Sequence, residues 1–140
     1  DAAAGFVLDG FPRTVEQVAI LDRVLERLGT SLDRVLALDA SEPVIVRRLG
    51  GRRVCPGCRA VYHLESRPPR SAGVCDACGA ALAQRADDDV AVIRERLRVY
   101  EERTVPVARA YEARGLLRRV DGSGEADVVF EALRAAVAGP

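Results

Sequence analysis

The chain of 140 residues contains neither lysine nor methionine, and only 4% of its residues are aromatic. Its 21 basic residues, all of them arginine, are balanced by 21 acidic residues, so the net charge gives no reason to expect a nucleic-acid or membrane partner. Proteins that bind single strands usually stack bases on aromatic side chains in a basic groove, and this composition offers few such side chains. We also expect no secretory leader in residues 1–4 and no membrane span, because no apolar run approaches roughly 20 residues.

The spacing of apolar residues predicts an α/β fold with a modest core. Short apolar runs predict strands at 5–8, 34–39 and 116–120. Helical spacing predicts helices at 14–28, 41–49, 87–115 and 125–137, and Pro106 should kink or divide the third of these near Thr104. Since strands that alternate with helices pair in parallel, we expect a parallel sheet. The residues expected to be buried are Val18, Leu21, Val24, Leu25 and Leu28 in the first helix, and Val128, Val129, Leu133 and Val137 in the last.

Residues 52–86 interrupt this pattern. Their composition changes to Cys, Pro, Gly and small polar residues. These residues include too few apolar side chains to form a stable core without a cross-link such as a metal or a disulfide. We therefore expect three parts, which are a core segment over 1–51, a small insert over 52–86, and a second core segment over 87–140.

The insert contains two CxxC pairs, Cys55 with Cys58 and Cys75 with Cys78, separated by 16 residues. Two such turns present four thiolates in a tetrahedral shell, which favours zinc or a substitute metal. A pair of disulfides is the alternative, but a reducing cytosol disfavours it. Because four cysteines close the coordination shell, the metal should be structural and should supply folding energy. Taken alone, this module would suit a nucleic-acid-binding zinc ribbon equally well.

The turn Asp9-Gly10-Phe11-Pro12-Arg13-Thr14 follows the first expected strand and opens a helix. Ligands of open parallel sheets bind at the carboxyl ends of strands, so this turn should border a pocket. Together with Gln17, the motif resembles the nucleoside monophosphate kinases, and adenylate kinases most closely. Further similarities to that family are 51–55 and 61–63 at the entry to its lid, 84–88 at the lid exit, and 94–97 in the next helix. The resemblance implies a P-loop-kinase-like α/β core in which the insert is a zinc-binding lid.

The resemblance also implies roles for individual residues. Gln17 would read the adenine edge of AMP, Arg48 would pack on the ATP adenine, and Asp9 would hold magnesium through water. The residues implied on the AMP side are Gly10, Phe11, Pro12, Arg13, Gln17, Arg85 and Arg96. Those implied on the ATP side are Arg48, Arg52, Val61, Tyr62 and Gly124. The catalytic residues would be Arg13, Arg52, Arg85, Arg96 and Asp9.

The activity that the resemblance implies is reversible phosphoryl transfer from ATP to AMP, giving two ADP, in nucleotide homeostasis. The family usually works as a cytoplasmic monomer with magnesium and, in this form, structural zinc, and no nucleic acid or membrane is involved. Phosphoryl transfer needs two aligned anionic nucleotides and neutralised charge rather than covalent help. Arginines suit that task because they never deprotonate. Closure of the lid would expel water that otherwise hydrolyses ATP.

A complete enzyme of this family would carry a glycine-rich loop with a lysine that cradles the ATP phosphates. The 140 residues contain no GxxxxGK sequence, which implies that the chain is N-terminally incomplete and inactive by itself. Either these residues belong to a longer, intact enzyme, or the fragment is real and inert as a kinase. We favour the first interpretation, because the chain starts inside a structural unit.

Several assignments stay open at this point. The chain would alternatively be a binding module in which the insert and the sheet recognise a nucleotide or a nucleic acid without turnover, or a related kinase acting on another monophosphate. Asp87 and Asp88 are interpreted equally well as helix caps and as parts of a lid hinge. His63, the only histidine, is interpreted as a structural residue or as a second-shell donor near the metal. The surface positions expected to carry solvated charges are Arg94, Arg98 and Arg103.

Overall fold

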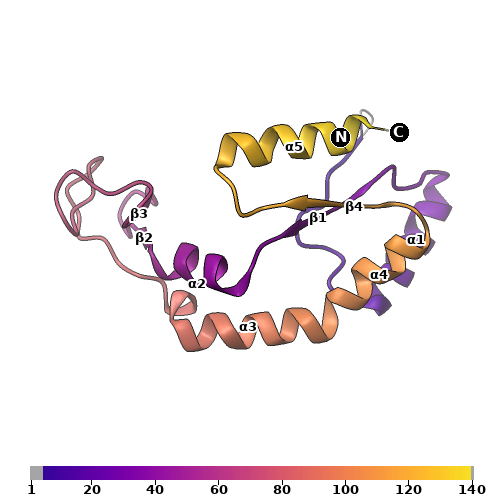
Figure 1. Ribbon diagram of the computed structural model, residues 1–140, viewed down its shortest axis with the longest axis horizontal. Helices are drawn as coiled ribbons and strands as arrows, with labels where there is room; N and C mark the ends of the chain where they lie inside the picture. The colour runs from indigo at the N-terminus through magenta and orange to yellow at the C-terminus, as the bar shows by residue number, and fades with distance from the viewer. Residues whose placement is uncertain (1–4, 140) are drawn as a thin grey trace. The chain divides into compact units, whose positions relative to one another are not determined.

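The computed structural model describes residues 5–139, so the expectation for residues 1–4 lies outside the described residues. The chain divides into two compact units (Figure 1). The first unit combines residues 1–39 with 98–140, and the second unit contains residues 40–97. Among the described residues, no helix combines the length and the apolar character that a membrane crossing needs.

The first unit is an α/β structure built on two parallel strands. Strand β1 (Val35–Asp39) pairs with β4 (Leu117–Asp121), and the register runs from Val35 opposite Leu117 to Asp39 opposite Asp121. Helix α5 (Ala126–Ala138) packs along β4, and α1 (Val15–Leu28) packs against α4 (Val105–Ala113), as Figure 1 shows. The core of this unit consists of Val18, Val107 and Tyr111, with Leu32, Val35, Leu116 and Leu117 packed against them. This arrangement confirms the expected α/β class and the parallel pairing.

Helix α1 begins and ends where the sequence predicted. The Thr14 side chain accepts a hydrogen bond from the Gln17 amide, which satisfies one of the free N–H groups at the helix start. Gly29 ends the helix in the left-handed region with a φ of 64°, where its amide donates to the Glu26 carbonyl. Of the five expected core residues of this helix, Val18, Leu21 and Leu25 are buried, whereas Val24 and Leu28 are exposed.

Two expectations for the first unit are wrong. Residues 5–8 form no strand, and Phe6, Val7 and Leu8 are exposed. A strand exists only through hydrogen bonds to a neighbour, and neither β1 nor β4 pairs with this segment. Helix α5 has no fully buried residue, since the sheet beside it contains two strands within residues 5–139. Val129 and Leu133 are half-buried there, while Val128 and Val137 are exposed.

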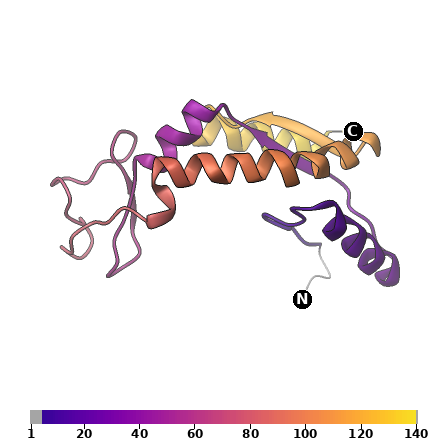
Figure 2. The same ribbon diagram turned by 90° about the horizontal axis from the view of Figure 1, so that it is seen from below.

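The second unit contains the insert and the helices on either side of it. It consists of α2 (Glu42–Gly50), the antiparallel pair β2 (Arg52–Val54) and β3 (Val61–His63), a short 3₁₀ turn η1 (Ala86–Asp88), and the first part of α3 (Val90–Arg103). Figure 2 shows the hairpin and the long loops that follow it. Helix α3 ends at Arg103 and α4 starts at Val105, which confirms the break expected from Pro106. The small core of the insert is built from Cys55, Tyr62 and Cys75, with Ala60, Ala80 and Leu82 packed against them.

Gly29 offers a direct test of how α1 is terminated. A Cβ atom at this position would meet nothing within 4 Å, so a substitution acts only through the backbone conformation. We expect Gly29→Ala to lower the free energy of unfolding by about 1 kcal/mol, because the left-handed conformation is unfavourable for alanine. Gly29→Asn should lose less, since asparagine tolerates this conformation better. Urea denaturation of both variants measures the difference, and equal stability of Gly29→Ala and the unmodified protein would contradict the assignment.

Candidate functional site

The four cysteine thiols of the insert come together at one point. Their Sγ atoms all lie within 4.8 Å of one another. Cys55 and Cys75 are buried, whereas Cys58 and Cys78 are exposed. Each CxxC pair is folded in the same way, because the amides of Cys55 and Cys75 each donate at 2.9 Å to the carbonyl five residues later. Two matching turns thus present two sulfur atoms each, as the sequence predicted.

The chemistry of this sulfur set fits a metal ion. Tyr62 places its hydroxyl 3.5 Å from the Cys75 Sγ and thereby lowers the pKa of that thiol to about 6. The Ala80 amide lowers the pKa of Cys78, but the neighbouring sulfurs of Cys55 and Cys58 outweigh it and raise that pKa to about 12. Four sulfurs at this distance cannot all ionise without a cation between them, and a bound metal supplies that positive charge. Cys55, Cys58, Cys75 and Cys78 therefore could hold a metal such as zinc.

Tyr62 and Val61 occupy opposite faces of β3. Tyr62 is 7% exposed, and its hydroxyl accepts a hydrogen bond from the Asp76 amide at 2.8 Å. Its side chain therefore supports the cysteine cluster. Val61 points outward and is 48% exposed. Of the two side chains, that of Val61 is the one exposed to solvent, and contact with ATP stays a prediction for both residues.

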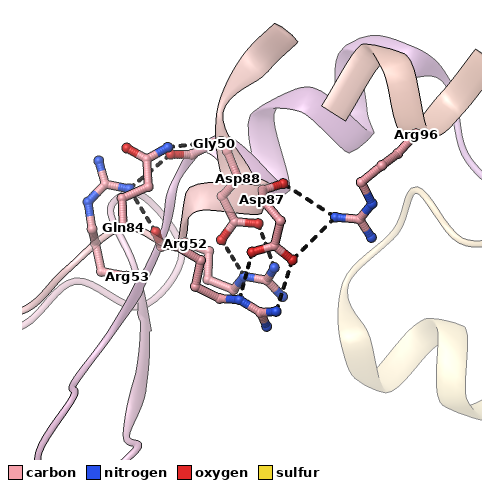
Figure 3. Close-up of polar contacts among 8 residues, drawn as sticks. Gly50, Arg52, Arg53, Gln84, Asp87, Asp88 and Arg96 are labelled. Carbon is pink, nitrogen blue, oxygen red and sulfur yellow. Dashed lines mark hydrogen bonds and ion pairs between the residues drawn. The ribbon is translucent and has the colours of Figure 1, made fainter. Parts of the chain in front are cut away.

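A buried ion pair joins the two ends of the insert. Arg52, the first residue of β2, donates to Asp88 from Nε at 2.8 Å and from a terminal nitrogen at 2.5 Å. The Asp88 side chain is fully buried, and the hydrogen bond from Arg52 holds the pKa of its carboxyl below the usual value. Gln84 lies beside them and donates to the Asp88 carbonyl at 2.9 Å (Figure 3). The segments that enter and leave the insert are thereby held together.

Asp87, the neighbour of Asp88, lies between two further arginines. Arg85 donates to both of its carboxylate oxygens at 2.9 Å. Arg96 reaches Asp87 from α3, with a terminal nitrogen 3.4 Å from the backbone carbonyl and 3.7 Å from the carboxylate (Figure 3). The side chains of Arg85 and Arg96 are both about half exposed. Two guanidinium groups from different elements therefore converge on a single anion, and solvent can reach them.

These pairings argue against a capping role for the two aspartates, and their part in a lid hinge stays a prediction. The side chain that caps α3 belongs to Asp89, which accepts a hydrogen bond from the Ala91 amide at 2.9 Å. Asp87 and Asp88 instead bind arginines. Sequence reasoning had not assigned these two residues as partners of Arg52, Arg85 and Arg96. The sequence did contain a signal for these pairs, because three adjacent aspartates, at 87–89, lie just after Arg85 in a chain that has arginine as its only basic residue type besides one histidine.

The Asp9–Thr14 turn lies in the first unit and is held by local hydrogen bonds. Arg13 folds back so that its Nε donates to the Gly10 carbonyl at 2.7 Å. The Gln17 side chain accepts from the Arg13 amide at 2.7 Å, and the Thr104 hydroxyl donates to the Arg13 carbonyl at 3.2 Å. In this conformation Gln17 shapes the start of α1, and its contact with adenine stays a prediction.

The remaining predicted residues are also placed by their elements. Asp9, Gly10 and Phe11 are exposed in the turn before α1, and Pro12 is half-buried. Arg48 is exposed in the last turn of α2, and Gly124 is exposed in the turn between β4 and α5. Arg52, Arg85 and Arg96 gather in the second unit, while Arg13 belongs to the first unit.

Comparison with known proteins gives a consistent result. The model of the adenylate kinase family matches residues 1–116. The chain is similar to the adenylate kinase of Carboxydothermus hydrogenoformans, with 44% identity over 98% of this chain and 64% of the relative. It is also similar to the adenylate kinase of Pelobacter propionicus, with 52% identity over 88% of this chain and 56% of the relative. The chain thus spans less than two thirds of the length of these curated relatives.

Removal of the metal should unfold the insert before the rest of the protein. Chelation, or Cys75→Ser, deprives residues 52–86 of their staple, and their apolar core is too small to replace it. Hydrogen exchange followed by mass spectrometry should therefore show lost protection over 52–86 and retained protection over α1. Unchanged exchange in the insert after verified removal of metal would show that the cysteines have no structural metal role.

Removal of one partner from the Arg52–Asp88 pair should be costly. Arg52→Ala leaves a buried carboxylate without a partner, which we expect to lower the free energy of unfolding by about 3 kcal/mol at neutral pH. Arg94→Ala is the matched control, because it breaks a pair with Glu42 in which both side chains are more than half exposed, and its effect should be small.

The pH dependence gives this test a second readout. Because Arg52 lowers the pKa of Asp88 in the folded protein, the stabilisation is complete at pH values above the pKa of an unfolded aspartate, about 3.9. The stabilisation is lost as the pH falls below that value toward the lower pKa of the folded state. Without Arg52, burial raises the pKa of Asp88, and the variant regains stability as Asp88 binds a proton. Urea denaturation at several pH values should show that the loss in free energy of unfolding caused by Arg52→Ala becomes smaller as the pH falls below 7. A deficit that is constant with pH would show that Asp88 is not the group responsible.

Proposed function

The chain belongs to the adenylate kinase family, and we propose that it supplies most of an enzyme that transfers a phosphoryl group reversibly from ATP to AMP, giving two ADP. The observation that carries this proposal is the convergence of Arg85 and Arg96 on Asp87. A carboxylate bound at that point shows that both guanidinium groups can engage a single anion. A phosphoryl group in transfer is such an anion, and it needs fixed positive charge on several oxygens.

Each side of the reaction has its own set of residues in this proposal. Arg52 would hold the ATP phosphates, and Arg85 and Arg96 would hold the transferring phosphoryl group and the AMP phosphate. The AMP contacts would be completed by Gly10, Phe11, Pro12, Arg13 and Gln17. The ATP contacts would be completed by Arg48, Val61, Tyr62 and Gly124. Asp9 would hold magnesium through water, and the magnesium would travel with ATP.

We assign a gating role to the insert. Residues 52–86 would act as a lid that covers the nucleotides, excludes water and favours transfer to AMP over hydrolysis. Arg52 and Arg85 lie at the two ends of this segment, so closure would bring both charges to the phosphates. Zinc bound by the four cysteines would keep the lid folded and take no part in the chemistry, because its coordination shell is full.

The glycine-rich phosphate loop is the part that the 140 residues do not contain. We propose that these residues act within a longer protein that supplies this loop, and that the 140 residues are inactive by themselves. A cytoplasmic monomer serving nucleotide homeostasis is the form that the family resemblance favours, with ATP, AMP and ADP as its only partners.

The direct experiment is an assay of the natural full-length protein. ADP formation should be measured from ATP and magnesium with each nucleoside monophosphate in turn, and AMP should be the preferred acceptor. The 140-residue chain, assayed in parallel, should form no ADP. A full-length protein without a phosphate loop, or one that binds nucleotides without turnover, would refute the proposed activity.

Arg96→Ala should lower turnover by about a hundredfold or more, because it removes a positive charge from the transferring group. Arg94→Ala is the matched control from the same helix, since its side chain pairs with Glu42 on the surface. Both variants should unfold at similar urea concentrations. If Arg96→Ala keeps the turnover of the Arg94→Ala control, Arg96 is not part of the active site.

A further inference from the structure

His63 makes contacts on both sides of its imidazole ring. Its Nδ1 atom lies 3.1 Å from the amide nitrogen of Glu65 and 3.1 Å from that of Ser66. Its Nε2 atom lies 3.3 Å from the Arg47 carbonyl in the last turn of α2. One ring therefore links the turn that follows β3 to the end of a helix that precedes the insert.

These contacts require one protonation state of the ring. Backbone amides only donate hydrogen bonds, so Nδ1 must accept from Glu65 and Ser66 and carries no proton. A carbonyl only accepts, so Nε2 must carry a proton and donate it to Arg47. The arrangement therefore fits only the neutral ring with its proton on Nε2.

Gly51 makes this close approach possible. A Cβ atom on Gly51 would lie 2.7 Å from Cε1 of the His63 ring and closer still to Nε2. Any larger residue would therefore push the ring away from the Arg47 carbonyl. The neighbouring Gly50 differs, because a Cβ atom there would meet nothing within 4 Å.

Two other contacts join the same segments. The Leu64 amide donates to the Gly51 carbonyl at 2.9 Å, and the Arg47 side chain forms an exposed ion pair with Glu65 at 3.6 Å. The ion pair is screened by solvent and contributes little. His63 is therefore the half-buried side chain that fixes the turn after β3 against the end of α2.

Arg52 lies directly opposite His63 in the β2–β3 pair. Any movement of His63 away from α2 is passed to Arg52 through this register, because opposite residues in an antiparallel pair share one face and nearby Cβ positions. We propose that His63 is a positioning residue, which sets the direction of β2 and thereby holds the Arg52 guanidinium at Asp88. The effect on ATP rests on the function proposed for Arg52, whereas the positioning itself does not.

Two substitutions separate the two sides of the ring. His63→Asn keeps an acceptor near the place of Nδ1 for the turn, but its side chain is too short to reach Arg47. His63→Gln places an amide N–H near the position of Nε2 and can keep the donation to Arg47. Gly51→Ala displaces the ring without changing His63, and Gly50→Ala is its matched control.

The first measurement is by NMR on the zinc-loaded, full-length protein that carries these residues. Long-range ¹H–¹⁵N correlations should show His63 in the Nε2–H form, with signals assigned by their absence in His63→Gln. The Arg52 Nε–H signal should exchange with solvent faster in His63→Asn and Gly51→Ala, and at the unmodified rate in His63→Gln and Gly50→Ala. A ring protonated on Nδ1, or an Arg52 signal that all four variants leave unchanged, would overturn the proposal.

The second measurement separates positioning from folding by steady-state kinetics. His63→Asn and Gly51→Ala should raise the KM for ATP by about tenfold, the loss expected for one charged hydrogen bond, and should leave the KM for AMP unchanged. His63→Gln should restore the unmodified KM for ATP. A fall in kcat alone, with both KM values unchanged, would indicate a folding defect and contradict positioning. If the unmodified protein forms no ADP, the proposed kinase activity fails, and the NMR result still decides the role of His63.

Discussion

The second unit depends on a carboxylate that is fully buried and held by two hydrogen bonds from one guanidinium group. Removing the Asp88 charge from water is expensive, and only a well-aligned partner offsets that cost. Arg52 supplies this partner from the first residue of β2, 36 positions earlier in the chain. The pair fixes the entry and the exit of the insert, and the short 3₁₀ turn that carries Asp88 also presents Asp87 to Arg85 and Arg96.

The insert differs from the rest of the chain because it has only a very small hydrophobic core. Its buried side chains are two cysteines and one tyrosine, with small apolar neighbours. In this setting the sulfur atoms serve as core residues and could also hold a metal such as zinc. Tyr62 joins both functions, because its ring fills the core while its hydroxyl contacts the Cys75 sulfur and the Asp76 amide. Binding of a metal at these sulfurs would therefore be coupled to the folding of this segment.

Arg52 differs from Arg85 and Arg96 in the burial of the carboxylate that it binds. Arg52 is bound to a buried carboxylate and is three-quarters shielded from solvent, with a side-chain exposure of 27%. Arg85 and Arg96 pair with an exposed carboxylate, and such pairs are weak because water competes for both partners. Under the proposed function, a phosphate with more charge would therefore replace Asp87 as their partner at little cost. Within the proposed function, Arg52 is a rigid element of the site and the other two arginines are exchangeable clamps.

The sequence by itself determined the features that depend on short-range chemistry. The apolar spacing predicted the extent of α1, Pro106 predicted the break between α3 and α4, and two CxxC spacings predicted the sulfur cluster. Only the tertiary structure decided which carboxylate each arginine binds, that Asp89 caps α3, and that His63 spans from the turn to α2. Residues 5–8 and the face of α5 were mispredicted for the same reason. Their burial depends on distant neighbours, and a local pattern shows that a residue is apolar but not what will cover it.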